Sequence, residues 1–201
     1  HRDLHSFPTR RSSDLAYTQN YNFKDALEYF NKTYEIISVS VNPNPIVLNS
    51  YYSNFAKYNM QISKIDKALE LYNKALLLEN SYLPQNHIVI AKTLNNLGNI
   101  HYQLNNFEKA ELNYLNSLNI FKSTLGDNNL MLVNCYNSLA NLLCVSSQYT
   151  KAIDYYNYSL SIVKNCFEDE NSYSAMLYNN LANVYKIGRA HVWTPVTEYD
   201  L

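Results

Sequence analysis

Apolar and small residues recur along the chain at the spacing of one face of an α-helix. One such set follows the order i, i+3, i+4 and i+7, and consists of Leu94, Leu97, Gly98 and His101. A second set continues the pattern beyond a short polar stretch, and consists of Ala110, Tyr114, Ser117 and Phe121. The two sets predict two amphipathic helices, A and B, joined by a turn near residues 104–106.

The same pair of patterns returns with a period of 42 residues. Helix B is anchored by alanines that are each 42 positions apart, namely Ala26, Ala68, Ala110 and Ala152. Helix A carries a small residue in the same register, at Ala56, Gly98, Ala140 and Ala182. The period predicts the B helix of one repeat, three full A–B repeats and the A helix of a fifth. We expect the first and last helices at 22–36 and 175–186.

Turn-forming residues gather in the connections from helix B to the next helix A. Pro43 and Pro45 lie in the first connection and Pro84 in the second. Gly126 stands where a helix would end, so we expect it to adopt a positive φ angle. One of the three residues that follow it, Asp127, Asn128 or Asn129, is expected to cap the next helix.

These residues resemble the tetratricopeptide repeat, whose pattern combines large, small and aromatic positions. The third copy supplies that pattern with Leu94, Leu97, Gly98, His101, Ala110, Tyr114 and Ser117. The 42-residue period and the LNNL-type A helices are similar to the kinesin light chain variety of the family. The resemblance covers residues 16–186 and departs at Asn59, His101 and Leu143, where the family usually has an aromatic residue.

The resemblance implies an all-α, right-handed superhelical solenoid of antiparallel helix pairs that acts as a protein–protein interaction module. In that architecture the A helices line the concave surface. The positions beside the packing stripe are therefore candidate peptide-binding residues, namely Lys57, Asn95, Asn99, Tyr102, Asn137, Asn141, Asn179 and Asn183. Six of the eight slots at the two main positions hold Asn, which is more than the Asn-rich composition explains.

Two interpretations of this row of asparagines stay open. The carboxamides can offer a donor and an acceptor to the backbone of an extended peptide. The same groups can instead bond to helices of adjacent repeats and serve stability alone. The chain would then be a structural spacer of a longer scaffold, or a regulatory array fused to an enzymatic or NTPase domain.

Composition and charge exclude several other functions. The chain has 201 residues, only 3 Gly and 5 Pro, and a net charge of −1, so a basic surface for nucleic acid is missing. No stretch is long and apolar enough to span a membrane. The three Cys are irregularly spaced and predict reduced thiols and a cytoplasmic location. We find no catalytic residues, no metal-ligand spacing and no cofactor motif, and expect a protein or peptide partner.

The two ends differ in composition from the middle of the chain. All four Arg and the single Trp lie in the flanks, within residues 1–15 and 187–201. Both flanks resemble translated sequencing adapters, so we expect them to be non-native and the repeat array to occupy residues 16–186. The outermost helices then lack stacking partners, which predicts self-association through uncapped ends.

Overall fold

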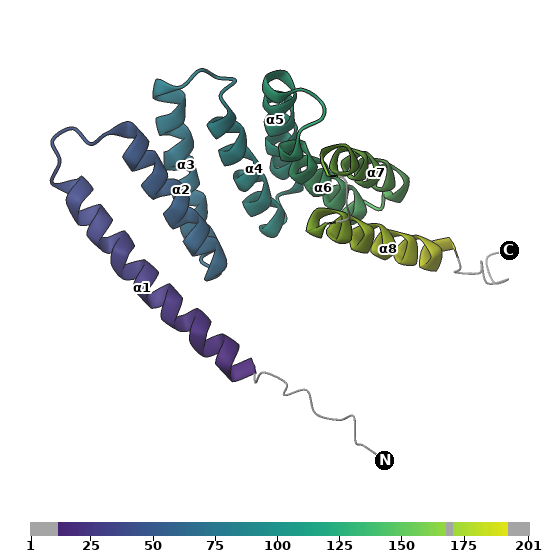
Figure 1. The fold of residues 1–201 in the computed structure, drawn as a ribbon, viewed down its shortest axis with the longest axis horizontal. Helices are drawn as coiled ribbons and strands as arrows, with labels where there is room; N and C mark the ends of the chain where they lie inside the picture. Colours follow the sequence, from purple (N-terminus) through teal and green to yellow (C-terminus); the bar gives the residue numbers. More distant parts are fainter. Residues whose placement is uncertain (1–11, 168–170, 193–201) are drawn as a thin grey trace, which may run out of the picture. The chain divides into compact units, whose positions relative to one another are not determined.

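The computed structural model describes residues 12–167 and 171–192, and every regular element in them is an α-helix (Figure 1). The helices are α1 (Ser12–Ser38), α2 (Pro45–Gln61), α3 (Ile65–Tyr82), α4 (Ile88–Gln103), α5 (Phe107–Leu125), α6 (Leu130–Val145), α7 (Tyr149–Cys166) and α8 (Ser172–Val192). The even-numbered helices are the expected A helices and the odd-numbered ones the B helices. This order confirms one B helix, three complete pairs and a final A helix.

The first and last helices are longer than the sequence pattern predicts. α1 begins at Ser12 rather than near residue 22, and α8 continues to Val192 rather than ending near residue 186. The helical backbone therefore enters both segments that resemble adapters. Most of those two segments, residues 1–11 and 193–201, lies outside the described residues, so their expected non-native origin stays a prediction.

The chain divides into two compact units, residues 1–71 and 72–201. In the first unit, α1 packs on α2 through aromatic side chains. The ring of Phe30 lies 4.8 Å from that of Phe55 and 5.5 Å from that of Tyr58. The Tyr58 hydroxyl donates a hydrogen bond of 3.1 Å to the carbonyl oxygen of Phe23. Aromatic packing thus joins helices of neighbouring repeats in this unit.

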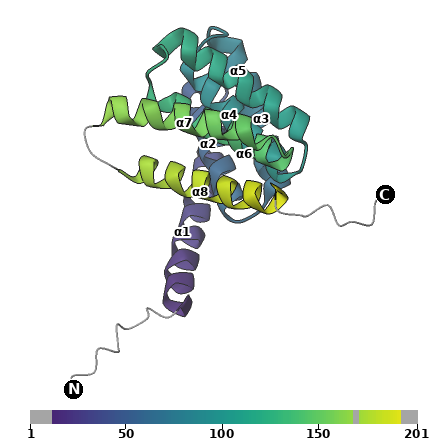
Figure 2. The ribbon, with the colours of Figure 1, turned by 90° about the vertical axis from the view of Figure 1, so that its right-hand side faces the viewer.

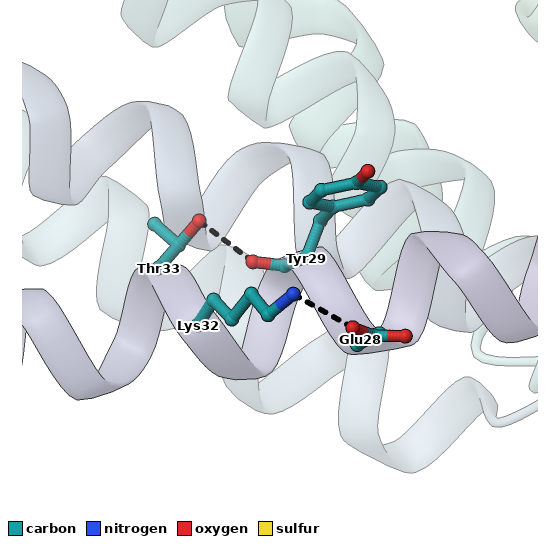
Figure 3. A network of polar contacts seen from close by, with 4 residues as sticks. All are labelled: Glu28, Tyr29, Lys32 and Thr33. Atoms are coloured by element: carbon teal, nitrogen blue, oxygen red, sulfur yellow. Dashed lines mark hydrogen bonds and ion pairs between the residues drawn. The ribbon is translucent and has the colours of Figure 1, made fainter.

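The outer surface of α1 carries local polar contacts (Figure 3). Lys32 Nζ lies 2.7 Å from Glu28 Oε1 and 5.5 Å from the ring centre of Tyr29. The Thr33 hydroxyl donates to the carbonyl oxygen of Tyr29 at 2.8 Å. These side chains are exposed and spaced by three or four residues, so they support the helix locally.

In the second unit, helix A packs on helix B of the same repeat most extensively in the pairs α4–α5 and α6–α7. α7 and α8 also lie side by side (Figure 2). Small and large buried residues recur at equivalent positions, with Ala110 and Tyr114 on α5 and Ala152 and Tyr156 on α7. α8 is less covered, and Tyr178, which its repeat position placed in the core, is 40% exposed. No described helix packs over that side of α8.

A residue with left-handed backbone conformation follows each A helix of a complete repeat, at the same position of the repeat. Among the described residues other than glycine, positive φ angles occur at Ser63, Asn105 and Ser147, which are one repeat apart. The backbone N–H of the residue after each of them donates a hydrogen bond to the carbonyl oxygen five residues earlier, as the Asn106 N–H does to the His101 carbonyl. This is the Schellman ending, in which a left-handed residue lets the chain reverse. The sequence located the turn but not its left-handed residue.

The start of the A helices also repeats. The side chains of His87, Asn129 and Asn171 occupy one repeat position, and each accepts a hydrogen bond from the amide two residues later. Asn129 is therefore the cap among the three candidates. Gly126 has a φ of 78°, as expected for a glycine that ends helix α5.

Gly98 lets α4 approach the ring of Tyr114 on α5. A Cβ atom at this position would lie 2.5 Å from two ring carbons of Tyr114. That ring is buried, so it has little room to move away. The small residue predicted at this position is therefore required by the distance between the two helices.

We expect Gly98→Ala to lower the free energy of unfolding. Overpacking costs about 1–3 kcal/mol, which outweighs the gain of about 1 kcal/mol from the higher helix propensity of alanine. Urea denaturation followed by circular dichroism measures the change. Ala140→Gly, at the equivalent position of α6, is the matched control; it should cost the helix propensity and the burial of one methyl group, without any overpacking. An increase in stability for Gly98→Ala would contradict the close approach.

Candidate peptide-binding surface

Four asparagines of the candidate row lie half-buried on two A helices that contact each other. Asn95 and Asn99 are on α4, and Asn137 and Asn141 are on α6. Within each helix the two asparagines are four residues apart and share a face. The structure therefore brings these four candidates into one region.

The carboxamide oxygens of Asn99 and Asn141 accept hydrogen bonds from tyrosines of helix B. The Tyr114 hydroxyl donates to Asn99 Oδ1 at 2.9 Å, and the Ser138 hydroxyl donates to the same oxygen at 3.4 Å. One repeat later, the Tyr156 hydroxyl donates to Asn141 Oδ1. Burial raises the pKa of both tyrosine hydroxyls, so they remain protonated donors at neutral pH.

The oxygens of the other two asparagines bond to the next A helix. Asn95 Oδ1 accepts from the thiol of Cys135 on α6 at 3.5 Å. Asn137 Oδ1 accepts from the amide of Asn180 on α8 at 2.7 Å. Each carbonyl end of the four carboxamides is thus engaged inside the protein, as the structural interpretation of the row requires.

The amide ends of the same four side chains face a different environment. None of their Nδ2 atoms donates a hydrogen bond to another described residue, and none belongs to the buried atoms left without a partner. The four Nδ2 groups therefore have no hydrogen-bond partner inside the described part of the protein, and they belong to side chains that are only half-buried. α2, α4, α6 and α8 include no Asp or Glu, so no acidic side chain of these helices competes for the amides.

The remaining candidates do not join this cluster. Tyr102 is half-buried, with its ring 5.9 Å from that of Phe107 in the same repeat. Asn179 and Asn183 are exposed on α8. Lys57 is exposed on α2, in the other compact unit, so it is not placed relative to the four asparagines.

Two of the three cysteines, Cys135 and Cys144, have the environment of unreactive thiols. Cys135 is fully buried, which raises the pKa of its thiol to about 11. Burial also raises the pKa of Cys144, and Cys166 is exposed. No cluster of three metal-binding side chains occurs in residues 12–167 and 171–192.

Sequence reasoning missed a buried polar pair between α3 and α4. Glu79 is fully buried, and its Oε1 accepts a hydrogen bond of 2.8 Å from the hydroxyl of Thr93. The equivalent positions of Glu79 in the next two repeats are Phe121 and Val163, both buried. A carboxylate in an otherwise apolar repeat position was the signal available in the sequence.

The repeated A–B helix pairs, packed on their neighbours along the chain, make this fold a helical-repeat solenoid. The family model of the tetratricopeptide repeat matches residues 46–123 and 89–144. Residues 46–144 of this chain therefore belong to the tetratricopeptide repeat family. Tetratricopeptide repeats generally act as protein–protein interaction modules.

The solved structures that share this fold include two repeat proteins. BtubC (BKLC) from P. vanneervenii is 25% identical, with a TM-score of 0.75, and the match covers 86% of this chain and 68% of that one. A kinesin light chain candidate from Podosopora anserina, with nearly identical TPR-like repeats, is 16% identical with a TM-score of 0.68; that match covers 87% of this chain and 83% of the other. No curated protein matches the sequence. None of the described helices is both long and apolar enough to cross a membrane.

His101 occupies an aromatic position of the family pattern, and burial lowers the pKa of its ring, with a smaller contribution from the charge of Lys109. Its Nδ1 is buried and has no hydrogen-bond partner among the described residues. The folded protein therefore favours the neutral ring, as expected of a histidine at a packing position rather than a ligand.

We expect His101 to make the protein less stable in mild acid. The unfolded ring takes up a proton near its usual pKa of 6.5, above the lowered folded pKa. The stabilising contribution is therefore complete above that value and is lost as the pH falls through the folded pKa. Urea midpoints measured from about pH 7.5 to about pH 5 should fall less in His101→Tyr than in the parent. Parallel pH profiles of the two proteins would contradict this assignment.

Proposed function

We propose that the chain binds an extended peptide segment of a partner protein along the surface formed by α4 and α6. The observation that carries the proposal is the set of four half-buried asparagines on contacting helices whose Nδ2 groups have no hydrogen-bond partner inside the described part of the protein. An extended peptide exposes main-chain carbonyl oxygens, which are the natural acceptors for such donors. The absence of acidic residues from α4 and α6 favours the same class of ligand.

The nearly uncharged surface of α4 and α6 limits how a peptide could be recognised there. Lys92 is the one charged side chain in α4 and α6. An arginine and lysine clamp for a terminal carboxylate is therefore not supported. Recognition by main-chain carbonyls and apolar side chains fits this surface better. We place the protein in a reducing compartment, the cytoplasm, because its three cysteines are unpaired.

We expect the simultaneous replacement of Asn95, Asn99, Asn137 and Asn141 by alanine to abolish peptide capture. A display library of random peptides of about 12 residues is selected on the full chain, and affinities are measured by fluorescence polarisation. Four lost hydrogen bonds, each contributing about 0.5–1.5 kcal/mol, should weaken binding more than tenfold. Selected peptides that bind this variant as tightly as the parent would contradict the proposal.

The matched control replaces four exposed asparagines of the B helices, Asn116, Asn119, Asn157 and Asn165, by alanine. It removes the same number of carboxamides from α5 and α7 and should leave binding unchanged. Thermal melting of both variants tests the alternative function as a structural spacer. The hydrogen bonds that Asn95 and Asn137 accept from the next A helix favour that alternative. A large loss of stability with no peptide selected at all would support the spacer instead.

The open face of α8 favours self-association as a further property of the chain. Met176, Tyr178, Tyr185 and Ile187 are exposed large apolar residues on this helix. Light scattering should detect oligomers that grow with concentration. The double change Tyr178→Lys and Tyr185→Lys should suppress them, whereas Leu112→Lys, at an exposed position of α5, should not. A parent chain that stays monomeric at high concentration would exclude this association.

A further inference from the structure

Two tyrosines that are one repeat apart each hold the oxygen of an asparagine in the candidate row. We propose that Tyr114 and Tyr156 are positioning residues that fix the carboxamides of Asn99 and Asn141 with the amide groups outward. These two side chains then present hydrogen-bond donors to a partner, and they select acceptors, above all the main-chain carbonyl oxygens of an extended peptide. The inference rests on the proposed function and specifies which end of each carboxamide meets the partner.

The orientation matters because a carboxamide is chemically two-sided. A half turn about its last torsion exchanges an acceptor for a donor of nearly the same shape. At Asn99 two hydroxyl donors, from Tyr114 and Ser138, meet the same oxygen. The reversed orientation would give up both of these bonds, and the two hydroxyls would have to turn from donors into acceptors to meet the amide. The amide therefore points away from the two hydroxyls.

The tyrosines can impose this orientation because their rings are held rigidly. Tyr114 is 2% exposed and Tyr156 is 1% exposed, so each ring is fixed in the core while its hydroxyl reaches the row of asparagines. At Tyr114 the ring lies so close to Gly98 that there is no space for even a Cβ atom between them. The position of the hydroxyl is thus set by the packing of helix B on helix A.

The outward donors of Asn99 and Asn141 have a consequence for specificity. A carbonyl oxygen or a carboxylate of the partner completes the hydrogen bonding of Nδ2. A partner donor at the same place would leave two donors facing each other, which is unfavourable when water is displaced. Replacing the contacting amide bond of a bound peptide by an ester, whose carbonyl is a weaker acceptor, should therefore weaken binding.

The orientation is tested first without any ligand. Side-chain amide signals of Asn99 and Asn141 are recorded by NMR in the full chain. Tyr114→Phe should shift and mobilise the Asn99 amide and leave that of Asn141 unchanged, and Tyr156→Phe should do the reverse. Tyr158→Phe, on the same helix as Tyr156, is the control and should affect neither amide. Unchanged Asn99 and Asn141 signals in both phenylalanine variants would overturn the proposal.

Binding then separates the positioning role from a merely structural one. The probe is the tightest peptide selected on the parent chain from the random library. Each phenylalanine variant should bind it about three- to tenfold more weakly, in conditions where the variant remains fully folded by circular dichroism. Unchanged affinity in both variants, together with loss in the fourfold asparagine variant, would overturn the positioning role but keep the peptide site. If no peptide binds the parent, the proposed function fails while the NMR result still decides the orientation.

Discussion

The close contact of helix A with a tyrosine ring of helix B is the constraint on which the second unit depends. Gly98 has no Cβ, so α4 can lie directly against the ring of Tyr114. The buried ring in turn carries its hydroxyl to Asn99 at the edge of the packed surface. One packing distance therefore sets both the core and the polar row. The equivalent tyrosine of the next repeat, Tyr156, makes the equivalent bond to Asn141.

The 42-residue period predicts most of this architecture because each repeat buries the same types of residue at the same positions. Ala110 and Ala152 are fully buried, as their 42-residue spacing requires, and the helix pairs begin and end near the expected turns. The caps also follow the period, although His87 does not have the residue type that identifies a helix start. Local patterns are informative here because nearly all of the packing is between neighbouring elements.

Other features depend on three-dimensional contacts that a pattern does not contain. The row of asparagines was visible in the sequence, but the partners of its oxygens lie up to 43 residues away, as for Asn137 and Asn180. Tyr178 is exposed although its repeat position is a core position in the other repeats, because repeat position indicates burial only where a neighbouring helix covers the site. The left-handed turn residues Ser63 and Ser147 were missed because serine gives no strong signal for that conformation. How Lys57 lies relative to the four asparagines is likewise a question of tertiary geometry.

The buried contact between Glu79 and Thr93 makes one joint of the array chemically different from the others. At the corresponding joints the two positions hold Phe121 with Cys135 and Val163 with Leu177, all of which are buried. A polar pair inside an apolar stack can specify which surfaces belong together, since a carboxylate set against an apolar neighbour would be left unsatisfied. The repeats are therefore similar in shape without being interchangeable in order. A shuffled or slipped array would place Glu79 against an apolar residue instead of Thr93, and the lost hydrogen bond would disfavour it relative to the native order.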